Sequence, residues 1–174
     1  MFFLQMSGFP GSGKSTLARV IAKSTGAIIV DHDIVKSALL ESIEESNIDS
    51  KVAGKISYNI DWSLIEFHLS QGYDVIFDSP CFYSEIFEKG SKLSKKYQAK
   101  YKYVECYLND IQEINKRLKK RDRMPSQIHE VSSKNNFEIA IDNSKKPSDI
   151  KCLLVDSGQP LESYINDVKH YLNE

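Results

Sequence analysis

Residues 8–16, with the sequence GFPGSGKST, carry the clearest chemical signal in the chain. They match every fixed position of the pattern G-x-x-x-x-G-K-[ST], whose backbone amides bind the phosphates of a nucleotide. The glycines allow the main chain to curl so that successive N–H groups point inward at an anion. Lys14 is expected to reach the β- and γ-phosphates, and the Ser15 hydroxyl to bind the Mg²⁺ that bridges them. We therefore expect ATP and Mg²⁺ to bind through Gly8, Pro10, Gly11, Ser12, Gly13, Lys14, Ser15 and Thr16.

An Asp-x-x-Lys pair, Asp33 and Lys36, follows the next apolar run and is the second candidate for chemistry. At the start of a helix these two side chains fall on one face. Asp33 is then expected to act as the general base that takes a proton from an acceptor hydroxyl. Lys36 is expected to bind an anionic group of the substrate. The plainer alternative is that Asp33 only caps the helix and that Lys36 is a solvated charge. Asp31 is less favoured for a functional role than Asp33.

Asp78 closes a third apolar run and is followed by Ser79-Pro80. A carboxylate at such a strand end holds Mg²⁺ or positions the acceptor in phosphoryl-transfer enzymes, so we expect Asp78 to do one or both. The alternative is a residue of an Asp-Ser-Pro turn. Tyr83, shortly beyond, is expected to contribute to the wall of an acceptor pocket, together with its neighbours Cys81 and Phe82.

Arginines gather near residue 120, where Arg117 and Arg121 are four positions apart and so share one helix face. Arg121 is expected to stabilise the charge on the transferring phosphoryl group, and Arg117 to contact the nucleotide by packing on adenine. The neighbouring lysines support a plainer interpretation, in which a basic helix end complements the helix dipole.

Apolar runs alternate with helical patterns along the chain, which predicts an α/β fold with a parallel sheet between helices. We expect strands near residues 1–6, 27–30, 73–77, 101–108 and 152–155. Helices are expected from residue 13 to Gly26, from Asp33 to about residue 46, and over residues 52–71, 84–97, 110–121 and 160–172, with a polar break at 47–50. The apolar stripe predicted for the helix over 52–71 consists of Ile56, Ile60, Leu64, Phe67 and Leu69.

The length of 174 residues predicts one domain, residues 1–174, in which a polar segment at about 122–148 forms a mobile lid with a short helix. Net charge is −1, so no strong overall field favours nucleic acid or an anionic membrane. No apolar run approaches the roughly 18 residues of a membrane span. The three cysteines form no C-x-x-C pair, and with no leader expected before the first strand we predict a reducing, cytoplasmic compartment.

The motifs GFPGSGKST, DHDIVK, VIFDSP and RLKKRDR, in this order, resemble those of the small P-loop kinases of the zeta-toxin, polynucleotide-kinase and chloramphenicol-phosphotransferase grouping, and of AAA-domain ATP-binding proteins. The resemblance covers essentially the whole chain. It implies a three-layer αβα P-loop NTPase fold with a five-stranded parallel sheet, Mg-ATP as donor, a lid arginine, and a base at Asp33. Lys36 stands where the polynucleotide-kinase pattern has an arginine.

Together these observations predict an ATP-dependent kinase that phosphorylates a hydroxyl of a small molecule or nucleotide. Two other interpretations remain open. One is an ATP-binding switch or partner-binding module with weak ATPase activity. The other is a nucleic-acid 5′-hydroxyl kinase, which the near-neutral net charge disfavours.

Overall fold

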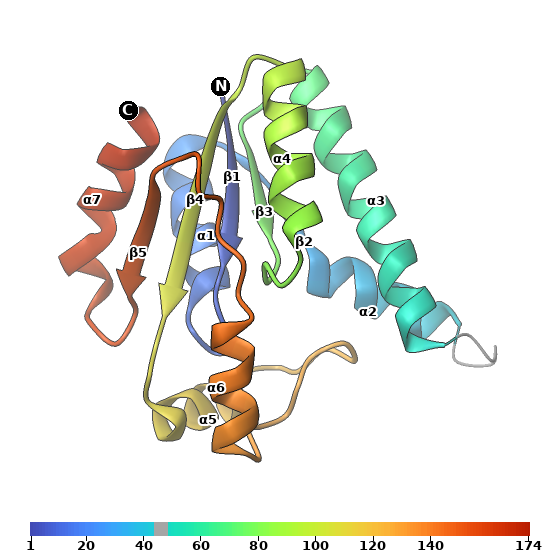
Figure 1. Cartoon of the computed structure of the whole chain (residues 1–174), viewed down its shortest axis with the longest axis vertical. Coiled ribbons are helices and arrows are strands. Elements are labelled where there is room, and N and C mark those ends of the chain that lie inside the picture. The colour runs from blue at the N-terminus through green and yellow to red at the C-terminus, as the bar shows by residue number, and fades with distance from the viewer. Residues whose placement is uncertain (44–48) are drawn as a thin grey trace.

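A five-stranded, all-parallel sheet forms the centre of the protein in a computed structural model that describes residues 1–43 and 49–174 (Figure 1). The strand order is β2-β3-β1-β4-β5, so the first strand of the chain lies in the middle of the sheet. This confirms the predicted fold class. The strands are β1 (Phe2–Ser7), β2 (Ile28–Asp31), β3 (Val75–Asp78), β4 (Lys100–Tyr107) and β5 (Cys152–Asp156).

Seven helices in the described residues cover the two faces of the sheet and its carboxyl edge. One face carries α1 (Lys14–Thr25) and α7 (Leu161–Asn173), and the other carries α3 (Ser50–Ser70) and α4 (Ser84–Lys96). Beyond the strand ends lie α2 (His32–Ser42), α5 (Ile111–Lys120) and α6 (Lys134–Asp142) (Figure 1). None of the helices in the described part of the chain has the length and apolarity that a bilayer crossing requires.

Two apolar cores lie on opposite faces of the sheet because the side chains of β1 alternate between them. Leu4 and Met6 are fully buried against α1 and α7, whereas Phe3 is fully buried against α3 and α4. A parallel strand enclosed by helices on both faces is mostly apolar, which explains why β1 is buried throughout and has only Gln5 and Ser7 as polar residues. The sheet is therefore rigidly packed just before the phosphate-binding loop.

The apolar stripe predicted for α3 is largely wrong. Ile60, Leu64 and Phe67 are 40%, 39% and 58% exposed. The buried face instead runs at four-residue spacing and includes polar residues; its members are Ala53, Ser57, Asp61, Ile65 and Leu69. This face contacts the sheet through Trp62, whose ring packs edge-on against Phe77 at 5.1 Å between centroids. The helix is therefore rotated from the predicted orientation, and Asp61 lies inside.

The cap of α2 also differs from the expected one. The carboxylate of Asp31 accepts a hydrogen bond from the Asp33 backbone N–H at 2.9 Å, so Asp31 is the N-cap and Asp33 lies in the first turn. The helix ends at Ser42, before the predicted end near residue 46. That predicted end, and most of the predicted break at 47–50, lie outside the described residues. The Asp33 side chain is therefore not the N-cap of α2.

The polar segment 122–148 contains the predicted short helix, α6, which packs over the carboxyl ends of the strands. Phe137 of α6 is buried and meets Phe9 of the phosphate-binding loop edge to face, with ring centroids 4.8 Å apart. A small cluster with Ile114 and Leu118 of α5 surrounds this contact. The segment is thus held against the loop by an apolar contact.

Candidate active site

The phosphate-binding loop adopts the curled conformation that its glycines predict. Gly8, Gly11 and Gly13 have φ angles of 134°, 86° and 86°, which side-chain-bearing residues rarely adopt. Gly8 is also required by space, since a Cβ atom there would lie 2.2 Å from the Cys106 carbonyl oxygen. The helix α1 begins directly after Gly13. Its N-terminus therefore points its unpaired backbone N–H groups and positive dipole end at the loop.

Two large cavities are lined by residues of the phosphate-binding loop. The first, termed the loop cavity, has a volume of about 550 Å³ and opens on this loop and the start of α1. Lys14 lies in its wall with only 8% of its surface exposed, and its Nζ is 3.6 Å from Asp78 Oδ1. Arg117 also lies in the wall and donates from Nη2 to the Ser157 carbonyl oxygen at 2.9 Å. The residues of the loop cavity that sequence analysis assigned to ATP are Gly11, Gly13, Lys14, Ser15, Thr16 and Arg117.

Three residues assigned to ATP lie elsewhere. Pro10 lines the second large cavity, and Gly8 lines a small cavity beneath the loop. Ser12 is buried, and its Oγ has no hydrogen-bond partner among the described residues. These residues belong to the curled loop, and their predicted contacts with ATP remain predictions.

Two carboxylates meet beside Lys14 at the carboxyl edge of the sheet, because β2 and β3 pair in a register that places Asp31 opposite Asp78. Asp78 is 3% exposed, and its Oδ1 lacks a hydrogen-bond partner in the described structure. Burial, reinforced by the charges of Asp78 and Asp33, raises the pKa of Asp31 to about 6. Carboxylate oxygens beside the Ser15 hydroxyl are the donor set that Mg²⁺ prefers. The residues present therefore fit a magnesium ion between the loop and Asp78.

We expect Asp31→Asn to stabilise the unliganded protein at neutral pH by an amount on the order of 1 kcal/mol, after allowing for solvent screening. A raised native pKa means that Asp31 favours folding below about pH 4, and that this contribution is lost as pH rises through about 6. Asparagine keeps the cap of α2 without the charge. Thermal unfolding from pH 4 to 8 in EDTA should show the variant gaining on the wild type as pH rises; parallel curves would contradict the prediction.

The second large cavity, termed the α2–α3 cavity, has a volume of about 640 Å³ and is lined by residues of both helices, of the loop after β3 and of segment 122–148. Asp33, Lys36 and Tyr83, three of the residues predicted to contact the acceptor, line it, whereas Asp78, the fourth, is not among its lining residues. Asp33 Oδ2 accepts a hydrogen bond from Gln127 Nε2 at 2.8 Å. The predicted base therefore faces the predicted acceptor pocket, where a side chain of segment 122–148 holds it.

The two large cavities adjoin, because Arg121 and Gln127 line both of them. Arg121 donates from Nη2 to the Ile128 carbonyl oxygen at 2.8 Å, and burial lowers the pKa of its guanidinium. Its Nε is buried without a hydrogen-bond partner among the described residues. A guanidinium held at the junction of two cavities is suited to contact a group that passes between them.

A buried histidine–carboxylate pair in the wall of the α2–α3 cavity was not found from the sequence. His32 Nδ1 lies 2.6 Å from Asp61 Oδ2, both residues are at most 5% exposed, and the His32 ring stacks on Tyr58 at 4.0 Å between centroids. Burial raises the pKa of Asp61 against the opposing effect of its hydrogen bond with His32. The sequence held one signal for this pair: Asp61 lies four residues before Ile65 and so shares its helix face, which is buried.

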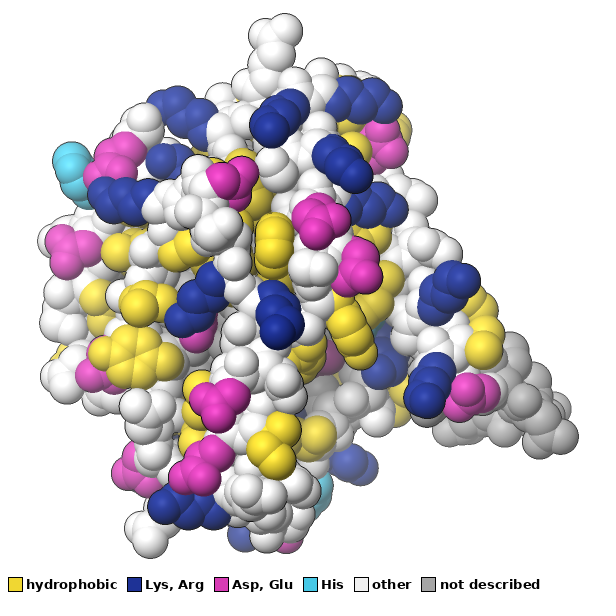
Figure 2. Space-filling view, in the orientation of Figure 1, with side chains coloured by type: hydrophobic (Ala, Val, Ile, Leu, Met, Phe, Trp, Pro, Cys, Tyr) yellow, Lys and Arg dark blue, Asp and Glu magenta, His cyan; other side chains and the backbone are white. Residues whose placement is uncertain are grey.

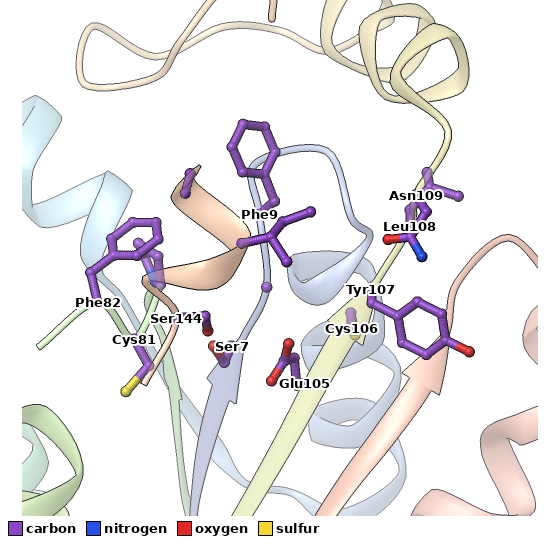
Figure 3. Close-up of a pocket in the computed structure, with 14 residues that line it drawn as sticks. Ser7, Phe9, Cys81, Phe82, Glu105, Cys106, Tyr107, Leu108, Asn109 and Ser144 are labelled. Carbon is purple, nitrogen blue, oxygen red and sulfur yellow. The ribbon is translucent and has the colours of Figure 1, made fainter. Parts of the chain in front are cut away.

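A third, small cavity lies directly beneath the phosphate-binding loop. Ser7 and Glu105 are among the residues that line it (Figure 3). Its volume of about 30 Å³ suits a water molecule and excludes a nucleotide. Cys81 also lines it; burial raises the pKa of this thiol to about 12, which keeps it protonated. The chemistry of the site therefore belongs to the two larger cavities.

The chain belongs to the AAA domain family, whose model matches residues 4–135. No curated protein matches the sequence. The matched range contains the phosphate-binding loop, both carboxylates at the sheet edge, Arg121 and the contact between Gln127 and Asp33. The class defined by the fold and by this family is that of P-loop nucleotide-binding proteins.

Solved structures with the same fold come from distant relatives. A protein from Chloroflexus aurantiacus J-10-fl has 16% identity and a TM-score of 0.74, covering 99% of this chain and 96% of its own. A sugar kinase from Janibacter sp. HTCC2649 has 16% identity and a TM-score of 0.68, with coverage of 99% and 95%. Kti12 from Chaetomium thermophilum, in complex with ADP-AlF3, has 14% identity and a TM-score of 0.66, with coverage of 98% for each chain.

Proposed function

We propose that the protein is an ATP-dependent kinase that transfers the γ-phosphoryl group to a hydroxyl of a small molecule or nucleotide. The observation that carries the proposal is the junction of the two cavities. Lys14 lines one cavity, Asp33 lines the other, and Arg121 lines both. This arrangement suits an in-line transfer between two bound substrates.

In the proposed reaction the loop cavity binds the donor nucleotide. Backbone N–H groups of the loop and the Lys14 ammonium hold the β- and γ-phosphates, and Arg117 contacts the nucleotide at the rim. Ser15 and Asp78 would hold Mg²⁺, which supplies charge neutralisation for the phosphates. Asp31 lies beside them as an additional carboxylate at the same sheet edge.

The acceptor hydroxyl is proposed to bind in the α2–α3 cavity, beside Asp33. The Asp33 carboxylate takes the hydroxyl proton, and the hydroxyl oxygen forms a bond to the γ-phosphorus. The bond from that phosphorus to the bridging oxygen breaks, and ADP leaves. Arg121 stabilises the negative charge on the transferring group.

Segment 122–148 is proposed to act as the lid of a single domain formed by residues 1–174. Its residue Gln127 contacts Asp33, and its residue Phe137 packs on Phe9 of the loop. Closure over both cavities would exclude water from the transferring phosphoryl group.

The likeness to the sugar kinase supports a kinase with a hydroxyl acceptor. The likeness to Kti12, which was solved in complex with ADP-AlF3, supports nucleotide binding and is compatible with both the kinase and the ATP-binding switch.

The test combines calorimetry of Mg-ATP binding with a transfer assay, in which labelled ATP is offered with nucleosides, sugars, antibiotics and 5′-hydroxyl oligonucleotides. Label on a small acceptor is the expected result. Binding with slow hydrolysis and no transfer would replace the kinase by the switch, and label only on oligonucleotides would make the protein a nucleic-acid kinase. Absence of any heat with Mg-ATP would overturn all three.

A further inference from the structure

The side chains that line the α2–α3 cavity carry an excess of positive charge. Four cationic side chains line it, and Asp33 is the single carboxylate that the described residues contribute to its wall. The chain as a whole has a net charge of −1, so this excess of positive charge is a local feature. The four cations are Lys36, Lys51, Lys55 and Arg121.

Three of these cations have no ion-pair partner among residues 1–43 and 49–174. Lys36, Lys51 and Lys55 make no ion pair or side-chain hydrogen bond with any described residue. Asp49, the described acidic residue nearest to Lys51 in sequence, caps α3 with its carboxylate and is not among the lining residues of the cavity. Figure 2 shows basic side chains over the N-terminal part of α3.

The lysines line the same cavity as the predicted base and come from two helices. Lys51 and Lys55 are one turn apart and therefore project from the same face of α3. Lys36 faces the same cavity from α2, one turn after Asp33. A ligand in the cavity would thus meet cations of both α2 and α3 in the same cavity that contains the Asp33 carboxylate.

The remaining wall is aromatic and suits the uncharged body of such a ligand. Tyr58, Phe82 and Tyr83 line the cavity together with two prolines. The volume of about 640 Å³ lies within the range of small-molecule sites, about 300–1,000 Å³. Such a volume admits one metabolite, which favours a small acceptor over a polynucleotide.

We propose that the phosphoryl acceptor is a small anionic metabolite, whose phosphate or carboxylate group binds Lys36, Lys51 and Lys55 while its hydroxyl lies at Asp33. This inference rests on the proposed kinase function and specifies its substrate class. Lysines suit this task because each supplies a compact positive charge with three donors. Opposite charge lining a cavity also raises the local concentration of an anionic substrate.

The test uses pairs of compounds that share all hydroxyls but one and differ in charge: ribose and ribose 5-phosphate, glucose and glucuronate, and adenosine and its 3′-monophosphate. We expect transfer to the anionic member with a KM at least about tenfold lower than for its neutral partner. The variant Lys51→Gln/Lys55→Gln should remove this difference by raising the KM for the anion, with kcat within about twofold. The variant Lys92→Gln/Lys95→Gln, with two exposed lysines of α4, is the matched control and should change neither value.

Each alternative outcome is decisive. Equal or better transfer to the neutral members, preferred transfer to a 5′-hydroxyl oligonucleotide, or an unchanged KM in the double variant would overturn the anionic acceptor. Calorimetry of the ADP-loaded protein with the same compounds provides a readout that needs no turnover. Anion binding that the double variant loses supports the inference, and no binding of any anionic member overturns it. Failure of the proposed function itself is distinguishable, because Mg-ATP would then give no heat, or would bind without transfer to any acceptor, whether anionic or neutral.

Discussion

Replacing Lys14 with alanine should abolish measurable Mg-ATP binding and, with it, phosphoryl transfer. Lys14 is buried at the start of α1, where its ammonium lies 3.6 Å from Asp78 within the wall of the loop cavity. Truncating one partner of a buried, charge-assisted contact costs about 2–5 kcal/mol, which corresponds to about a thirtyfold loss of affinity or more. Isothermal calorimetry with Mg-ATP measures the effect directly.

The control for this variant is Lys23→Ala, which removes an exposed lysine from the last turn of the same helix. It should bind Mg-ATP like the wild type. The thermal unfolding of Lys14→Ala should be recorded as well, because the variant leaves Asp78 buried beside no cation. A folded Lys14→Ala protein with unchanged affinity would show that the loop does not hold a triphosphate.

Replacing Asp33 with asparagine should lower kcat by about 10²-fold or more while leaving the affinity for Mg-ATP within about twofold. Asp33 lines the α2–α3 cavity and not the loop cavity, so the donor site does not depend on its charge. Asparagine retains an oxygen that can accept the hydrogen bond from Gln127. The separation of turnover from binding is what distinguishes a base from a structural residue.

The measurement is steady-state transfer to whichever acceptor the screen identifies, paired with calorimetry. Asp167→Asn, at an exposed position of α7, is the charge-matched control and should leave both values unchanged. Full activity in Asp33→Asn would remove Asp33 from the proposed mechanism. Since Asp31 already caps α2, helix stability should be unaffected in either case.

The parts of the fold that could be predicted are those in which local pattern and tertiary environment agree. β1 is apolar because helices cover both of its sides, and the loop motif has a conformation that few residues other than glycine tolerate. The orientation of α3 could not be predicted in the same way. Its apolar residues are compatible with more than one face, and the face that docks includes Asp61, whose burial depends on a histidine 29 positions away.

In the candidate site, too, the residues that belong to a local motif could be predicted, and those that depend on tertiary packing could not. Lys14, Asp33 and Arg121 were identified because each belongs to a short motif. The capping role of Asp31 depends on the exact residue at which β2 ends, and this follows from its pairing with β3. The neighbourhood of Lys36 with Lys55 depends on how α2 and α3 pack, and no local pattern carries that information.

The position of β1 in the middle of the sheet has a consequence for biosynthesis. β1 pairs with β3 on one side and with β4 on the other, and the outer strand β5 spans Cys152–Asp156. A nascent chain leaving the ribosome therefore displays an apolar strand whose second neighbour emerges about a hundred residues later. Such long-range parallel pairing is slow and prone to aggregation, so early engagement by a holdase chaperone should raise the yield of folded protein.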